Sequence, residues 1–183
     1  LYYSMKLKNH NLTIFSLAPE HQCSNYWWNE TEGELKASVF ASIIIKHITK
    51  YCIKDSTNQR ENDKNNIILY SDGCGYQNRN IILSNALLNF SINNNIILEQ
   101  KYLVKGYTQM ACDSVHSLIE RSLKNTKIYL LSDYIKITKS ARKNPSPYES
   151  INLEHTDFYD FKNLNFYKSI RPGKVKGDSE ENL

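Results

Sequence analysis

The sequence predicts an α/β domain in which a mixed sheet starts with antiparallel strands, continues with parallel strands and is flanked by helices. Three observations predict this class. Apolar residues recur with a helical period between residues 35 and 53. The short apolar run "IILYSD" at 67–72 is typical of a strand covered on both faces. Helical and strand patterns then alternate over short links, which favours parallel strands.

At 183 residues the chain has the length of one ordinary domain. We expect a single domain over residues 1–170 and a mobile tail over 171–183, because "RPGKVKGDSEENL" lacks apolar anchors. The net charge of +4 is compatible with a polyanionic partner but is also ordinary for a globular protein.

The amino-terminal part predicts three strands. Apolar and β-branched residues at 5–7 and 12–17 surround "KNHN", whose asparagines suit a hairpin turn. The segment "SNYWWNET" at 24–31 is the expected third strand of an antiparallel meander. Glu32 and Glu34 precede the helix at 35–53, where negative charge would favour its first turn.

The later elements continue the alternation. Residues 78–90 and 111–123 are predicted helices, and 96–104 is a predicted strand. The segment 127–145 is predicted to be a loop or short strand followed by a helix that ends before Pro145, and residues 148–161 to add an edge element.

Asp72 is the first candidate for chemistry. It follows the predicted strand at 67–72, and ligands of open α/β sheets gather at the carboxyl ends of strands. Gly73 and Gly75 would remove steric bulk beside it. The alternative is a simple turn, since Asp-Gly is common turn chemistry.

The predicted helix at 111–123 carries the second candidate group. Asp113, His116 and Glu120 share one stripe of this helix, next to an apolar face. The alternative is a solvated face with an aspartate that favours the helix dipole. Carboxylates that converge from separate elements are what Mg²⁺ requires, and a pair of such ions can hold the oxygens of a phosphodiester in line.

Other side chains give weaker signals. The four cysteines are widely spread and predict free thiols, and no apolar run or leader pattern indicates a membrane or a secretory signal, so we expect an intracellular protein. Cys74 is a candidate hydrolase nucleophile only if a histidine lies beside it. Trp27 and Trp28 would stack on bases or pack in the core, where the aromatic residues of a strand more often lie. Several cations are candidates for phosphate contacts or for solvated surface: Arg79, Lys101, Lys105 and Arg121.

Two blocks also carry a resemblance. "YSDGCGYQNRN" and "GYTQMACDSVHSLIE" resemble the S-D-N-C-G-G-Q-N-[KR]-N and G-H-T-x-M-x-x-D-x-x-[HF]-x-x-I-E blocks of a family of transposon-associated proteins of eukaryotes. "DFKNLNFYKSIRPGKVKGD" and the order of the upstream segments are similar as well, so the resemblance covers nearly the whole chain. The family looks like a ribonuclease-H-like or integrase-like fold.

The resemblance implies a transposase- or nuclease-like domain, descended from a metal-dependent enzyme of DNA phosphoryl transfer. It implies that Asp72, Asp113 and Glu120 are catalytic residues that ligate Mg²⁺ or Mn²⁺. DNA is then the expected partner and the nucleus the expected location, with no membrane and no small-molecule cofactor. Six residues are candidate contacts to the nucleic acid: Gly73, Gly75, Gln77, Asn78, Arg79 and His116.

Departures from the family pattern predict weak or absent activity. Gly73, Tyr76 and Tyr107 replace an asparagine, a glycine and a histidine of the two blocks. The family's first acid would lie upstream of Leu1, on a first strand that this chain is expected to lack. The second hypothesis is therefore a catalytically dead domain that binds nucleic acid or protein.

Overall fold

The computed structural model describes residues 7–18, 22–53, 66–104, 106 and 109–170. The chain divides into two compact units, each assembled from separate parts of the sequence. The first comprises residues 1–34 and 109–156, and the second comprises residues 35–108 and 157–183. The single domain over 1–170 stays a prediction. The tail at 171–183 lies outside the described residues.

The first unit contains a mixed three-stranded sheet in the order β1-β2-β5. Strand β1 (Asn9–Phe15) is antiparallel to β2 (Cys23–Asn29), and β2 is parallel to β5 (Glu149–Asn152). The predicted third strand and the carboxyl-terminal edge element are thus confirmed as β2 and β5.

The predicted hairpin turn at "KNHN" is wrong. Asn9, His10 and Asn11 belong to β1, where they pair with Asn29, Trp28 and Trp27. Their side chains support the sheet instead of a turn, since the His10 ring lies 5.4 Å from that of Trp28 and the Asn11 amide donates to the Tyr26 carbonyl. The preceding predicted strand falls almost entirely outside the described residues.

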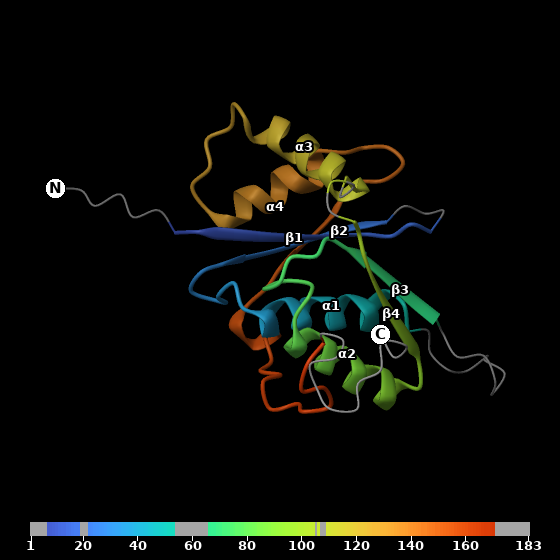
Figure 1. Ribbon diagram of the computed structural model, residues 1–183. Helices are drawn as coiled ribbons and strands as arrows, with labels where there is room; N and C mark the ends of the chain where they lie inside the picture. The colour runs from blue at the N-terminus through green and yellow to red at the C-terminus, as the bar shows by residue number, and fades with distance from the viewer. Residues whose placement is uncertain (1–6, 19–21, 54–65, 105, 107–108, 171–183) are drawn as a thin grey trace. The chain divides into compact units, whose positions relative to one another are not determined.

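Helices α3 (Ala111–Leu123) and α4 (Leu131–Ser140) lie side by side on one face of this sheet (Figure 1). Both were predicted, α3 with the bounds it has in the structure. Alternate residues of β2 face them, because side chains alternate along a strand. Cys23 and Trp27 therefore form a core with Val115 and Ile119 of α3 and with Tyr148.

The second unit pairs two helices with a two-stranded parallel sheet. Helices α1 (Ala37–Tyr51) and α2 (Ile81–Asn94) pack against each other (Figure 1). Strand β3 (Asn66–Ser71) runs parallel to β4 (Ile97–Tyr102), as predicted. The core of this unit lies between the helices and one face of the sheet, and its buried members are Ala41, Ile48, Leu83, Ala86, Leu87 and Ile96.

Strand β3 differs from expectation in its burial. Ile67 and Leu69 pack on the core, whereas Ile68 and Tyr70 are 40% and 48% exposed. The continuous apolar run predicts a strand covered on both faces, but the burial alternates with the period of a strand that has one open face.

The segment that follows residue 156 is fastened along α1 and α2. Ser42 Oγ accepts from the backbone N–H of Tyr159 at 2.9 Å, and Phe161 and Leu164 pack on the core. Asn85 of α2 is buried. Its side-chain oxygen accepts a hydrogen bond from the N–H of Tyr167 at 2.8 Å, and its amide nitrogen donates to the Leu164 carbonyl at 2.7 Å. Polar side chains of the two helices thus form hydrogen bonds with backbone N–H and C=O groups of a segment that has little regular structure of its own.

The α/β class is confirmed, with four helices, a mixed three-stranded sheet and a two-stranded parallel sheet among the described residues. A single ribonuclease-H-like sheet stays a prediction. No helix in the described part of the chain is long and apolar enough to cross a membrane.

Candidate functional site

Asp72 lies at the carboxyl end of β3, where the chain leaves the sheet and enters the loop before α2. One carboxylate oxygen, Oδ1, accepts from the backbone N–H of Cys74 at 3.2 Å and from the side-chain amide of Asn78 at 2.7 Å. The first bond closes an Asx turn, which is the turn chemistry expected of an Asp-Gly pair. Oδ2 accepts no hydrogen bond from any residue that the structure describes, and it remains open to a ligand.

Asn78 connects this turn to β4. While its amide holds Asp72, its carbonyl accepts from the Tyr102 hydroxyl at 3.1 Å and from the Gln100 side chain at 3.4 Å. Burial raises the pKa of Tyr102, partly offset by the nearby Arg79, so the hydroxyl keeps its proton and donates. The candidate contact Asn78 thus fixes the position of the acid.

The other loop candidates differ in exposure and contacts. The Arg79 guanidinium lies 5.5 Å from the centre of the Tyr102 ring, a cation–π arrangement on an exposed side chain. Gln77 donates to the Tyr76 hydroxyl, and Tyr76 lies against Phe40. Asn80 caps α2 by accepting the N–H of Leu83 at 2.9 Å.

Gly73 and Gly75 are not required by packing. A Cβ added at either position would meet no atom of a described residue within 4 Å, and neither has a positive φ. Packing therefore does not explain these two glycines, and the space that they border among the described residues is available to a ligand near Asp72.

Asp113 lies in the first turn of α3, and its hydrogen bond is that of a helix cap. Its Oδ2 accepts from the backbone N–H of Met110, the residue before the helix, at 2.7 Å. Asp133 occupies the same position in α4 and accepts the N–H groups of Tyr129 and Leu130 at 3.0 Å each. Two helices of one unit thus start in the same way, which favours the capping interpretation of Asp113.

His116 and Glu120 lie further along α3, and both are exposed. The imidazole Nε2 of His116 is 2.9 Å from the Thr13 hydroxyl, which donates to the buried Asn25 at 2.7 Å. Cys112 Sγ donates to the Thr13 carbonyl at 3.6 Å, so Cys112 and His116 tie α3 to β1. The apolar face predicted for this helix is confirmed, since Val115, Leu118, Ile119 and Leu123 all join the core of the unit.

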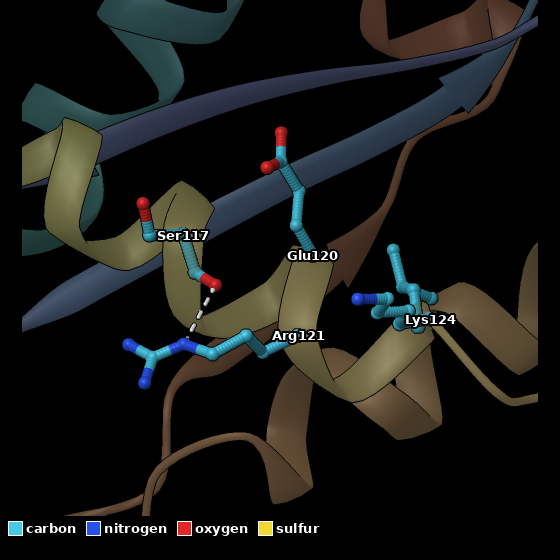
Figure 2. A pocket seen from close by; sticks show the side chains of 5 residues that line it. Ser117, Glu120, Arg121 and Lys124 are labelled. Carbon is cyan, nitrogen blue, oxygen red and sulfur yellow. Dashed lines mark hydrogen bonds between the residues drawn. The ribbon is translucent and has the colours of Figure 1, made fainter.

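Glu120 borders an open surface pocket of about 660 Å³, lined among the described residues by Ser117, Glu120, Arg121, Leu123 and Lys124. Figure 2 shows that its carboxylate points away from Arg121, whose Nε donates to the Ser117 carbonyl at 3.4 Å. The pocket offers one acid and two cations without a convergent pair of carboxylates.

The three predicted metal ligands are divided between the units. Asp72 belongs to the second unit, and Asp113 and Glu120 belong to the first. In the described ranges no group of three His, Cys, Asp or Glu side chains is arranged to hold a metal ion. Mg²⁺ often takes only one or two carboxylates and completes its shell with water and phosphate oxygens, so the metal stays a prediction.

The cysteines and the two tryptophans are the remaining candidates. All four cysteines are free, as predicted, and burial raises the pKa of Cys23 to about 12 and also raises that of Cys112. A thiol hydrolase would require a histidine beside Cys74. Among the described residues, no histidine forms a hydrogen bond with Cys74. Trp27 and Trp28 are buried, which confirms their core interpretation.

Sequence reasoning missed the aromatic partners of two cations. Lys101 Nζ lies 5.9 Å from the centre of the Tyr70 ring, and Arg79 lies over Tyr102. The available signal was the strand period of "ILYS" and "ILEQKY", which places Tyr70 and Lys101 on one face once the register is known. Glu32 and Glu34 are expected to lie next to the first turn of the helix at 35–53, but α1 begins only at Ala37. Glu32 accepts a hydrogen bond from the backbone N–H of His155.

Comparison with known proteins yields no match: no family model, no curated protein and no solved structure matches this chain.

Proposed function

We propose that this chain is a transposase- or nuclease-like domain, descended from a metal-dependent enzyme of DNA phosphoryl transfer, that binds DNA and is weak or inactive as a catalyst. The observation that carries the proposal is Asp72. It stands at the carboxyl end of a parallel strand, one of its oxygens is fixed by Asn78, and the other is open beside two glycines that packing does not require.

The position of Asp72 is also what the sequence resemblance leads us to expect of one acid of such a site. In that class of enzyme, Asp72 would help to hold a divalent metal, which would supply the Lewis acid for attack of water or a DNA 3′-hydroxyl on a backbone phosphate. The residues of this chain would hold the carboxylate at the strand end through Cys74 and Asn78 and would offer Arg79 to a phosphate.

Weak or absent catalysis is supported by Asp113 and by the altered loop. The Asp113 oxygen that accepts the Met110 N–H is already used in the manner of the Asp133 cap. Gly73 and Tyr76 stand where the resembling family has an asparagine and a glycine. These observations favour the second candidate, a catalytically dead domain that binds nucleic acid or protein, over efficient cleavage.

The test measures binding and cleavage of labelled DNA by the full chain, with Mg²⁺, with Mn²⁺ and with a chelator. Asp72→Asn is the informative variant, because an amide oxygen can still accept the Cys74 N–H while the charge is lost. Asp133→Asn is the matched control, since it removes the charge of an acid that already has a capping role.

We expect DNA binding by the unchanged chain, slow cleavage at most, and loss of any cleavage with the chelator and in Asp72→Asn but not in Asp133→Asn. Failure to bind single-stranded and double-stranded DNA would contradict the proposal. Cleavage that survives both the chelator and Asp72→Asn would also contradict it. Fast cleavage that needs both Mg²⁺ and Asp72 would overturn the expectation of weak activity.

A further inference from the structure

One face of the β3–β4 sheet is open although the opposite face packs on α1 and α2. We call it the outer face and define it by the alternate residues Ile68, Tyr70, Ile97, Glu99 and Lys101. Its three apolar or aromatic side chains are each 40% to 48% exposed. Parallel strands are usually covered on both faces, and contiguous exposed apolar side chains commonly mark a binding surface.

Tyr70 is the centre of the outer face. It pairs across the strands with Lys101, whose Nζ lies 5.9 Å from the ring centre and 3.4 Å from the Glu99 carboxylate. An exposed ring beside a cation can accept a flat ring on its surface while the cation meets a negative group. One position further along β3 the chain turns out of the sheet, and Asp72 follows.

The charge of the chain favours a polyanion at this unit. The second unit includes 14 lysines and arginines against 10 acids, whereas the first includes 9 of each. The whole excess of positive charge thus belongs to the unit that contains the outer face. At the carboxyl end of the same sheet, Arg79 and Tyr102 form a second pair of cation and aromatic ring.

We propose that the outer face binds an unpaired strand of nucleic acid, with a base stacked on Tyr70 and a backbone phosphate contacted by Lys101, and that the strand continues over the carboxyl end of the sheet, where Arg79 contacts a further phosphate. This inference rests on the proposed function and specifies the form of nucleic acid that reaches Asp72. Bases in a duplex are stacked on each other, so an exposed side-chain ring distinguishes a single strand from a duplex.

A second copy of the chain is the main competing occupant. Two copies that meet through this face would bring together two units of the same net charge, which opposes association at low salt. A nucleic acid strand instead releases counterions when Lys101 and Arg79 contact its phosphates, so its binding should weaken as salt is added.

The experiment measures fluorescence anisotropy of a labelled oligo(dT) of about 20 nucleotides, its duplex with oligo(dA), and the matching oligo(U), each with the full chain. We expect the single strands to bind about ten-fold more tightly than the duplex, and Tyr70→Ala to weaken single-strand binding about ten-fold. Tyr70→Trp should restore it, because stacking tolerates a change of aromatic ring. Lys101→Ala should reduce the salt dependence.

The matched control is Tyr129→Ala, which removes a tyrosine that is 79% exposed in the first unit. Equal effects of Tyr70→Ala and Tyr129→Ala, or equal affinity for single strand and duplex, would overturn the inference. A dimer in sedimentation that Tyr70→Ala dissociates would also overturn it, in favour of a second copy. DNA binding that does not depend on Tyr70 would overturn the inference but leave the proposed function intact. Binding that depends on Tyr70, without cleavage, would support the inference and indicate a catalytically dead domain.

Discussion

Replacing Asn85 by alanine should destabilise the second unit strongly, because this side chain holds the carboxyl-terminal segment against α2. Asn85 is 3% exposed and makes three hydrogen bonds: it donates to the carbonyls of Leu164 and Tyr167 at 2.7 and 3.3 Å and accepts the Tyr167 N–H at 2.8 Å. Each bond contributes about 1 kcal/mol net, and backbone groups left without a partner add to the loss. We expect the free energy of unfolding to fall by about 2–4 kcal/mol.

The assay is urea unfolding followed by far-ultraviolet circular dichroism. The midpoint should move down by about 1–2 M urea with little change of slope. Both tryptophans lie in β2 of the first unit, so their fluorescence separately reports whether that unit unfolds at the same urea concentration. Hydrogen exchange at the Tyr167 amide should also become faster.

Asn93→Ala is the matched control, because Asn93 lies in the same helix but is exposed. Its effect should stay within about 0.5 kcal/mol, since alanine is the better helix former. If Asn85→Ala and Asn93→Ala have the same midpoint, or if the Tyr167 amide exchanges at its original rate, the clamp does not stabilise the unit and the reasoning is refuted.

Asp113→Asn and Asp133→Asn should lower the melting temperature by similar small amounts, because each carboxylate accepts a hydrogen bond from the N–H of the residue before its helix. Loss of DNA binding in Asp113→Asn alone would show that Asp113 does more than cap the helix. Backbone N–H groups hold the pKa of Asp133 below its usual 3.8. The stabilisation by its carboxylate is therefore complete above pH 3.8 and disappears as the pH falls through the lower folded-state pKa. Acid unfolding curves of Asp133→Asn should lack this loss of stability. Alkylation of Cys23 should be about a thousand-fold slower in the native than in the unfolded chain, because burial raises its pKa from about 9 to about 12; rapid native labelling, mapped by mass spectrometry, would contradict this. Gly73→Ala should leave the melting temperature unchanged or slightly higher, since the added Cβ meets nothing within 4 Å, and a drop of several degrees would show a hidden packing role.

Most of the fold was predictable from the spacing of the apolar residues along the sequence. The apolar spacing at 35–53 and 111–123 located α1 and α3, and the alternation of patterns indicated the parallel pairing of β3 with β4. The turn at "KNHN" was predicted from the usual preference of asparagine, but pairing with β2 and contact with Trp28 outweighed it. The burial of β3 was misjudged because an apolar run does not reveal whether a sheet has one covered face or two.

The candidate site was predictable only in its local part. Both alternatives raised for single residues are visible in the structure, since Asp72 closes a turn and Asp113 caps a helix. The roles of Asn78 and Tyr70 depend on which residue of β4 lies opposite each residue of β3, and a local pattern does not determine that register.

The two units share one chain that passes between them at residues 34–35, 108–109 and 156–157. Neither unit is therefore a continuous stretch of sequence, and no single cut releases one of them whole. A truncation after residue 156 would remove Phe161 and Leu164 from the core built by α1 and α2. A shortened chain would consequently lose part of a unit instead of a whole one, and point substitutions on single faces are the appropriate way to assign a function to either unit.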